Sequence, residues 1–265
     1  MRFVYIETRP KLNVVDMVED DVWRYEELPK ALESQQSMTK IQLARLVKWK
    51  ITHGVHRPFL PGMIQKNTEA EVQEHTEKAA SLIKDIQPGQ GAAAITSAIE
   101  AALKQVCNLK SVGPATGTLV LSVFQPKLVP FFEDELYFCL HADHTGKLKY
   151  DKAEYKSLLV EALDIVLNQN VEAQALEKTA YVLMHADKLS DDAKKELEQC
   201  LDVTSAGDQA KDDTAEAREQ LPKSKASIEE AAPEGSDVKK ARARRKVDVQ
   251  EDDDASLRRS KRRKP

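Results

Sequence analysis

The residues best suited to chemistry lie in a short segment between two apolar stretches. Gly113 permits a turn with a positive φ, Pro114 suits the first position of a helix, and Gly117 lets that helix approach a neighbour closely. Backbone N–H groups at a helix N-terminus favour a phosphate oxygen. The spacing predicts a helix-hairpin-helix whose contacts to phosphate come from Lys110, Ser111, Val112, Gly113, Pro114, Ala115 and Thr116.

This segment resembles the hairpin of the helix-hairpin-helix DNA glycosylase superfamily, on the pattern Leu-x-x-Val-Gly-Pro-Ala-Thr-Gly that begins at Leu109. The similarity spans residues 95–140. It places residues 129–136 where the superfamily carries a catalytic aspartate, with Glu133 at that position by ungapped counting and Asp134 after a one-residue insertion. The resemblance implies a monofunctional glycosylase, in which the carboxylate stabilises oxocarbenium charge and orients water.

The chain also departs from that superfamily. Ala115 stands where glycosylases with lyase activity carry a Schiff-base lysine, so no amine is available at that position for covalent catalysis. Ser111 replaces the first glycine of the family hairpin, and the iron–sulfur cysteine cluster of some members is absent. Residues 38–58 are similar to uncharacterised fungal proteins that share the hairpin. The resemblance is therefore to a branch without the lyase lysine.

Each of these motifs also has a purely structural interpretation. The hairpin can be an ordinary turn between two helices, and Glu133-Asp134-Glu135 can be the acidic first turn of a helix, where carboxylates favour the positive end of the dipole. His141, Asp143 and His144 contain metal-ligating groups, but no fourth ligand is identifiable, so we expect no metal. Trp23 and Trp49 are expected in the core. Arg57 can form a local ion pair or hold a phosphate.

Hydrophobic periodicity predicts an all-α fold for residues 1–202. Thr39 with Gln42, Thr68 with Glu71, and Asp151 with Glu154 have the form of capping boxes that begin helices. A further helix is expected from about Ala92 to Cys107. Asn170 and Ser190 are expected to cap the last two helices. The few residues from Arg2 to Ile6 alone suggest a strand.

Residues 203–265 are predicted to form a disordered tail, because they lack aromatic residues and are dominated by small and charged ones. Two basic clusters in this tail resemble a bipartite nuclear import signal, which predicts an import receptor as partner and the nucleus as location. The clusters can also bind nucleic acid by releasing counterions. Their cations are Lys239, Lys240, Arg242, Arg244, Arg245, Lys246, Arg258, Arg259, Lys261, Arg262, Arg263 and Lys264.

The composition excludes several classes. The chain has 265 residues and a net charge of -4, and no apolar stretch is long enough for a membrane helix. Cys107, Cys139 and Cys200 are far apart, so neither a disulfide framework nor a cysteine zinc site is indicated. No cofactor is expected.

Three hypotheses follow. The leading one is a nuclear, non-enzymatic protein whose hairpin contacts DNA phosphates or a chromatin protein, with Lys110 as the nearest flexible cation. The second is a monofunctional DNA glycosylase that uses Asp134 or Glu133. The third is a protein-interaction scaffold in which the hairpin is structural.

Overall fold

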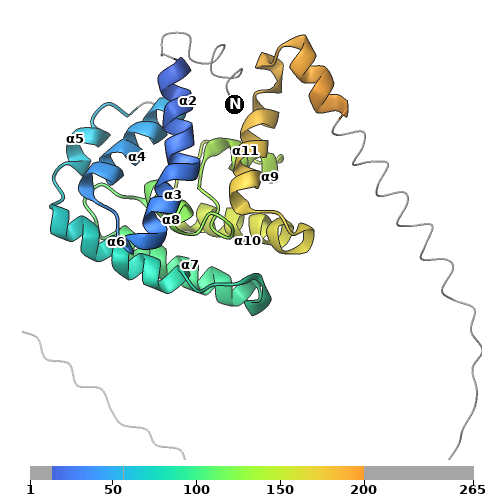
Figure 1. Ribbon diagram of the computed structural model, residues 1–265. Helices are drawn as coiled ribbons and strands as arrows, with labels where there is room; N and C mark the ends of the chain where they lie inside the picture. The colour runs from blue at the N-terminus through green and yellow to red at the C-terminus, as the bar shows by residue number, and fades with distance from the viewer. Residues whose placement is uncertain (1–13, 56, 200–265) are drawn as a thin grey trace, which may run out of the picture. The chain divides into compact units, whose positions relative to one another are not determined.

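The computed structural model describes residues 14–55 and 57–199, and it confirms the predicted all-α class (Figure 1). No strand occurs within those ranges. The suggested strand at residues 2–6, the tail and both basic clusters lie outside the described residues. The helices are α2 (Val14–Val22), the π-helix η1 (Trp23–Glu27), α3 (Leu28–Ser34), α4 (Lys40–His53), α5 (Leu60–Ile64), α6 (Glu69–Ile83), η2 (Pro88–Gln90), α7 (Ala92–Val106), α8 (Pro114–Phe124), α9 (Asp134–Leu140), α10 (Lys152–Gln169), α11 (Ala173–Met184) and η3 (Ala186–Lys188).

The predicted capping boxes begin the helices α4, α6 and α10. At the first of them the Thr39 hydroxyl accepts a hydrogen bond from the Gln42 backbone N–H at 3.2 Å, and the Gln42 side chain accepts one from the Thr39 N–H at 2.8 Å. The boxes at Thr68 and Asp151 have the same reciprocal form. Each box satisfies two N–H groups that a helix start would otherwise leave unpaired.

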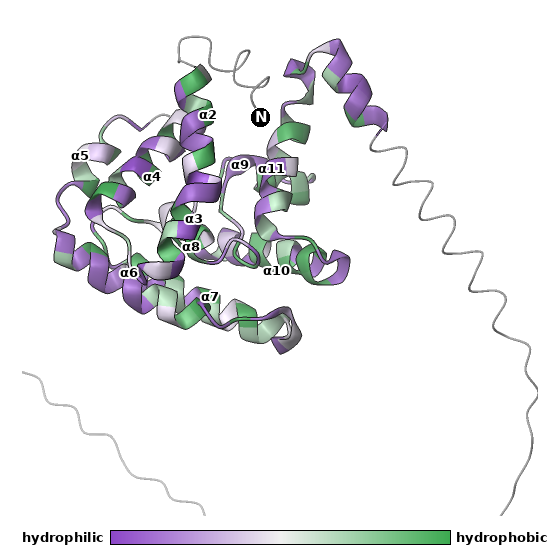
Figure 2. Ribbon diagram, viewed as in Figure 1, coloured by the Kyte–Doolittle hydropathy of each residue, from purple (hydrophilic) through white to green (hydrophobic). Residues whose placement is uncertain are grey.

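Helix α8 is the central element, and every residue from 115 to 123 is buried. It packs against α3, α4, α6, α7 and α10. It lies close to α7 at Gly117, where an added Cβ would lie 2.6 Å from Cδ1 of Leu103. The predicted packing role of Gly117 is therefore confirmed. Figure 2 shows α7 mostly hydrophobic and α6, which lies beside it, mostly hydrophilic.

The N-terminal helices α2, η1 and α3 follow one another without a break over residues 14–34. Within η1 the consecutive residues Trp23, Arg24 and Tyr25 are all buried. Because a π turn contains more residues than an α-helical turn, neighbouring side chains of η1 spread over a narrower arc than they would in an α-helix.

Asn170, expected to begin a helix, ends one instead. Asn170 ends α10 in the left-handed conformation, with φ of 52°, and does not start α11. Asparagine tolerates this conformation better than most residues. Helix α11 begins at Ala173 after Glu172. Residues 191–199 are helical after Ser190, whose hydroxyl accepts a hydrogen bond from the Ala193 N–H at 3.3 Å. None of the helices described is both long and apolar enough to cross a membrane.

Candidate functional site

The hairpin between α7 and α8 turns at Ser111, not at Gly113. Ser111 has a φ of 65°, whereas Gly113 is extended with φ of -91° and ψ of -178°. The predicted positive φ at Gly113 is therefore wrong: Ser111, two residues earlier, adopts the left-handed conformation. Gly113 is the N-cap of α8 and Pro114 its first residue, as expected. Ser111 and Gly113 are both exposed.

Lys110, the cation expected to contact phosphate, is joined to the start of α6. Its Nζ lies 3.0 Å from Glu71 Oε1 and donates a hydrogen bond to the Lys66 carbonyl at 3.3 Å. Its backbone N–H donates to the Asn67 side chain at 2.7 Å, and the Asn67 amide donates back to the Lys110 carbonyl. The Lys110–Glu71 pair is exposed, and such pairs contribute little to stability. Lys110 therefore has a competing partner that a phosphate would have to replace.

Both candidate carboxylates, Glu133 and Asp134, line a pocket of about 360 Å³. The two residues are adjacent in the sequence, but most of the residues that line the pocket come from other parts of the chain. Its aromatic lining consists of Tyr25, Trp49, Phe131, Phe132, Tyr150 and Tyr181. Its charged or titratable lining consists of Lys50, His53, Arg57, Glu133, Asp134, Glu135 and His185.

Glu133 is the N-cap of α9 and is the most perturbed acid of the pocket. Its Oε1 atom is buried and has no hydrogen-bond partner in the described part of the chain. Burial, reinforced by the negative charges of Glu177 and Glu135, raises the pKa of Glu133 well above its usual value, although Arg24 opposes the shift. This carboxyl group is therefore able to carry a proton above the usual pH range of a glutamate and to donate it.

Asp134 and Tyr150 form the polar wall next to Glu133. The Tyr150 hydroxyl donates a hydrogen bond to Asp134 Oδ1 at 2.6 Å, which fixes the orientation of the carboxylate. Burial and this hydrogen bond raise the pKa of Tyr150, so its hydroxyl remains a donor. Tyr150 has a φ of 56°, an unfavourable conformation for a tyrosine that recurs at functional sites. The Arg57 guanidinium lies 5.5 Å from the centre of the Tyr150 ring.

Lys50 of α4 adds an amine that we did not predict. Its Nζ lies 5.8 Å from the centre of the Phe131 ring, and it has no hydrogen bond or ion pair to any described residue. Burial first, and then the charge of Arg57, lower the pKa of Lys50 to about 8. One feature of the sequence could have indicated this position. Lys50 lies three residues after Val47 and seven after Leu43, which places it on the same face of α4 as these two buried residues.

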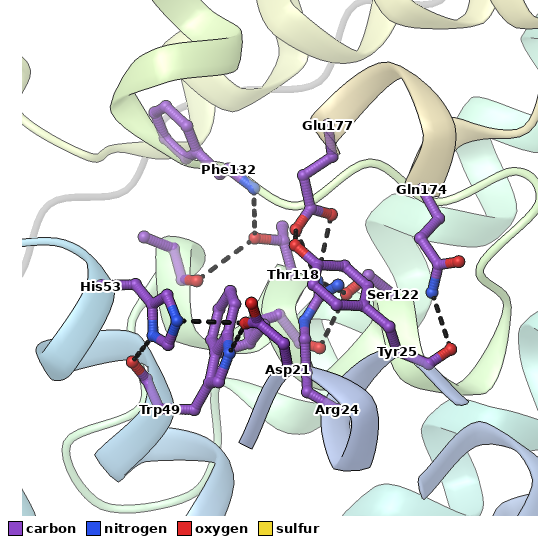
Figure 3. Close-up of polar contacts among 12 residues, drawn as sticks. Asp21, Arg24, Tyr25, Trp49, His53, Thr118, Ser122, Phe132, Gln174 and Glu177 are labelled. Atoms are coloured by element: carbon purple, nitrogen blue, oxygen red, sulfur yellow. Dashed lines mark hydrogen bonds and ion pairs between the residues drawn. The ribbon is translucent and has the colours of Figure 1, made fainter. Parts of the chain in front are cut away.

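Beside the pocket a buried cluster holds the surrounding helices in place (Figure 3). Arg24 donates hydrogen bonds to Glu177 Oε2 at 3.0 Å and to Ser122 at 3.2 Å, and the Tyr25 hydroxyl donates to Glu177 Oε1 at 2.9 Å. The guanidinium also lies 4.0 Å from the Tyr25 ring centre. These contacts join the π-helix, α8 and α11 across more than a hundred residues of sequence.

Further contacts hold two segments that border the pocket, namely the residues before Glu133 and the end of α4. The Phe132 N–H donates a hydrogen bond to the Thr118 hydroxyl at 3.1 Å, which ties the segment to α8 (Figure 3). Trp49 stacks on His53, with ring centres 4.3 Å apart, and donates to Asp21 at 2.9 Å. Trp23 and Trp49 are buried, so their predicted core positions are confirmed. Trp49 lines the pocket as well.

A second, more open groove of about 700 Å³ contains the hairpin turn. The groove and the pocket share Arg57, so the hairpin and the two carboxylates belong to adjoining surfaces. Phe59 is 80% exposed on this groove. The residues that line it are Arg57, Pro58, Phe59, Leu60, Met63, Cys107, Leu109, Ser111, Val112 and Gly113.

Of the two histidines near residue 141, His141 forms hydrogen bonds and a ring contact, and His144 forms ring contacts with Tyr137 and Phe138. His141 Nε2 lies 2.7 Å from the Ser157 hydroxyl, its Nδ1 lies 3.1 Å from the Tyr137 carbonyl, and its ring stacks on Tyr137. Across residues 14–55 and 57–199 there is no group of three or more histidine, cysteine or acidic side chains placed to hold a metal ion.

Comparison with known proteins gives no relative for this arrangement. No family model matches the chain, and neither a curated protein nor a solved structure matches it significantly.

Proposed function

We propose that this protein is a DNA-binding enzyme that hydrolyses the glycosidic bond of a nucleobase extruded from the duplex. The observation that supports this most strongly is the Glu133 carboxyl group, whose buried Oε1 atom has no hydrogen-bond partner among the described residues, in an aromatic pocket that adjoins the hairpin groove. An enzyme that acts on a base must take it out of the stack and hold it between aromatic side chains. Buried groups with strongly shifted pKa values in a cleft are typical of catalytic sites.

The two carboxyl groups suit different steps of this hydrolysis. Protonated Glu133 donates its proton to the departing base while the bond between C1′ and the base nitrogen breaks. Asp134, oriented by Tyr150, stabilises the positive charge that develops on the sugar and directs a water molecule to C1′. The water oxygen bonds to C1′ and its proton passes to Asp134. The products are a free base and an abasic sugar.

The hairpin would position the DNA for this reaction. The exposed residues Ser111 and Gly113, just before α8, would offer their backbone N–H groups to a phosphate at the positive end of that helix. Arg57, between the groove and the pocket, is a second candidate for phosphate contact because its side chain borders both. A non-enzymatic role in DNA or chromatin binding would use the same groove, but it gives no reason for Glu133 to lie unpartnered in the pocket.

The basic clusters of residues 239–246 and 258–264 complete the proposal. They support import into the nucleus by a receptor that reads two basic segments, and they add electrostatic attraction to DNA. A fluorescent fusion of the full chain is expected in the nucleus. Exchange of Lys239, Lys240, Arg244 and Arg245 for alanine should move it to the cytoplasm; unchanged nuclear signal would contradict the assignment.

Release of a free base from DNA tests the proposed hydrolysis of the glycosidic bond. Full-length protein is incubated with duplexes that each carry one uracil, hypoxanthine, 8-oxoguanine or ethenoadenine, and the free base is measured by mass spectrometry. Glu133→Gln and Asp134→Asn should each lower release by about 10² to 10⁴-fold. Glu100→Gln is the matched control, because Glu100 forms an exposed ion pair with Lys156 away from the pocket. Duplex binding without release from any substrate would favour the non-enzymatic hypothesis.

A further inference from the structure

We infer that Lys50 is an amine nucleophile, which forms a covalent imine with the aldehyde of an abasic deoxyribose bound in the pocket. The inference rests on the proposed function in one respect, namely that the pocket admits a deoxyribose from DNA. It adds a second activity, capture of the abasic sugar. It also assigns that activity to a residue outside the hairpin.

The surroundings of Lys50 differ from those of the paired lysines. Lys78, Lys110 and Lys156 each lie within about 3 Å of a carboxylate, at 2.6, 3.0 and 3.2 Å. Lys48, two residues before Lys50 on α4, is exposed and lies 3.7 Å from Asp20. Lys50 instead points its Nζ toward an aromatic wall and has no partner in the described structure. A half-buried amine that lines a pocket and forms no ion pair with a described residue is accessible to a ligand in that pocket.

The pocket also keeps part of this amine unprotonated. The pKa of Lys50 is lowered to about 8 by burial and by Arg57, although Asp134 and Glu133 oppose the shift. Near pH 7.5 about a quarter of such amines are neutral, against about a thousandth for a lysine of ordinary pKa. Desolvation and a neighbouring cation are the usual means by which proteins activate a lysine as a nucleophile.

The chemistry balances without any further reagent. Hydrolysis of a glycosidic bond leaves a hemiacetal that is in equilibrium with its open aldehyde. The lone pair of Lys50 Nζ forms a bond to C1′, and the electron pair of the carbonyl bond moves to oxygen. Proton transfers within the pocket, to which a protonated Glu133 can contribute, then release that oxygen as water. Amine and aldehyde give imine and water, and the reverse reaction restores both.

The amine of this pocket comes from a helix outside the hairpin, so the residues of the hairpin do not reveal it. Position 115 holds a buried alanine, so the hairpin supplies no amine. Lys50 reaches the cavity from α4, more than sixty residues earlier in the sequence. The absence of a lysine at one position of a motif therefore does not remove the chemistry from the site, because another helix borders the same cavity.

Reductive trapping tests the inference. Full-length protein is mixed with a duplex that already contains an abasic site, in the presence of sodium cyanoborohydride, which reduces an imine to a stable amine. A covalent protein–DNA band is expected on a denaturing gel, and peptide mapping should place it on Lys50. Lys50→Arg should lower trapping by about 100-fold, and Lys48→Arg should leave it unchanged. The trapping rate should rise with pH around a midpoint near 8.

Peptide mapping is essential because the chain carries many other lysines. An adduct of equal yield in Lys50→Arg, an adduct mapped to another amine, or no adduct despite duplex binding would each overturn the inference. Circular dichroism of Lys50→Arg shows whether the variant is folded, and Lys50→Met provides a second one. Because the abasic site is preformed, trapping does not depend on base release. Trapping without release would refute only the hydrolysis, and release without trapping would refute only the role of Lys50.

Discussion

Two polar clusters of this molecule contain the same kinds of charged groups and differ in how those groups are partnered. The closed cluster consists of Arg24, Tyr25, Ser122 and Glu177; its ion pair measures 2.8 Å, and only Arg24 Nε lacks a hydrogen-bond partner. The open cluster consists of Lys50, Glu133, Asp134 and Tyr150. There one short hydrogen bond joins Asp134 to Tyr150, and the buried Glu133 Oε1 has no partner among the residues described. The half-buried Lys50 has its Nζ 5.8 Å from the centre of the Phe131 ring and forms no ion pair with a described residue.

The difference separates stability from function. A buried charge with its partners in place holds helices together, and removal of one partner is costly. A buried charge without a partner lowers stability and is retained where a ligand will use it. The two clusters also interact, because Glu177 and Arg24 act in opposite directions on the pKa of Glu133. We therefore expect removal of the charge of Lys50 or Glu133 and removal of a partner from the closed cluster to change stability with opposite signs.

The largest effect is expected in the closed cluster. Glu177→Ala should lower the free energy of unfolding by about 3 to 5 kcal/mol, because it leaves Arg24 charged and buried without its carboxylate. Urea denaturation measures the change. The double variant Arg24→Met, Glu177→Leu is the control and should lose less than the single variant. A loss below about 1 kcal/mol for Glu177→Ala would show that the pair does not hold the helices together.

The next effect has the opposite sign. Lys50→Met should raise the free energy of unfolding near pH 7 by about 1 to 3 kcal/mol, because it removes a desolvated charge. The folded pKa of Lys50 is about 8 and the ordinary value is 10.5, so the unfolded chain binds more protons between these values. Stability of the unmodified protein should therefore rise with pH through this window, and the advantage of the variant should vanish above it.

The matched control for that experiment is Lys48→Met on the same helix. Lys48 is exposed, and its loose ion pair with Asp20 should contribute almost nothing. Chemical denaturation at about pH 7 and pH 11 gives both comparisons. A Lys50→Met protein that is less stable at pH 7 would mean that the Lys50 ammonium is well accommodated, which would remove the contrast between the clusters.

The smallest effect is expected at Glu133. Its folded pKa is raised, so its contribution to stability is fully present below the pKa of the unfolded chain and is lost as pH rises toward the folded value. Glu133→Gln cannot ionise and should melt a few degrees higher than the unmodified protein at about pH 8, with no difference near pH 4. Melting curves at both pH values measure this. A lower melting temperature at pH 8 would indicate that the ionised carboxylate is stabilised.

Much of the scaffold could be predicted from local sequence. Capping boxes depend on residues three apart, so Thr39 with Gln42 and Asp151 with Glu154 identify helix starts without any tertiary information. The candidate acids Glu133 and Asp134 were found because they follow a motif closely. Both interpretations of them are compatible with the structure, since they start α9 and also line the pocket.

The rest of the site depends on long-range packing. Lys50, Arg57 and Tyr150 are scattered over a hundred residues, and only the fold brings them to one cavity. The turn was misassigned for a local reason, because glycine merely permits a positive φ and Ser111 adopted it at a cost. Asn170 likewise suits both ends of a helix, and sequence alone did not choose between them.

The π-helix η1 makes the position of the whole N-terminal segment sensitive to a single residue. The π turn already takes up one residue more than an α-helical turn, so one further inserted residue would rotate everything on the N-terminal side by about 100° relative to α3. Met17 packs on Tyr181, which borders the pocket, so that rotation would reach the cavity through its neighbour. The length of this helix is thus as restrictive as its composition, and substitutions there should be tolerated more often than insertions.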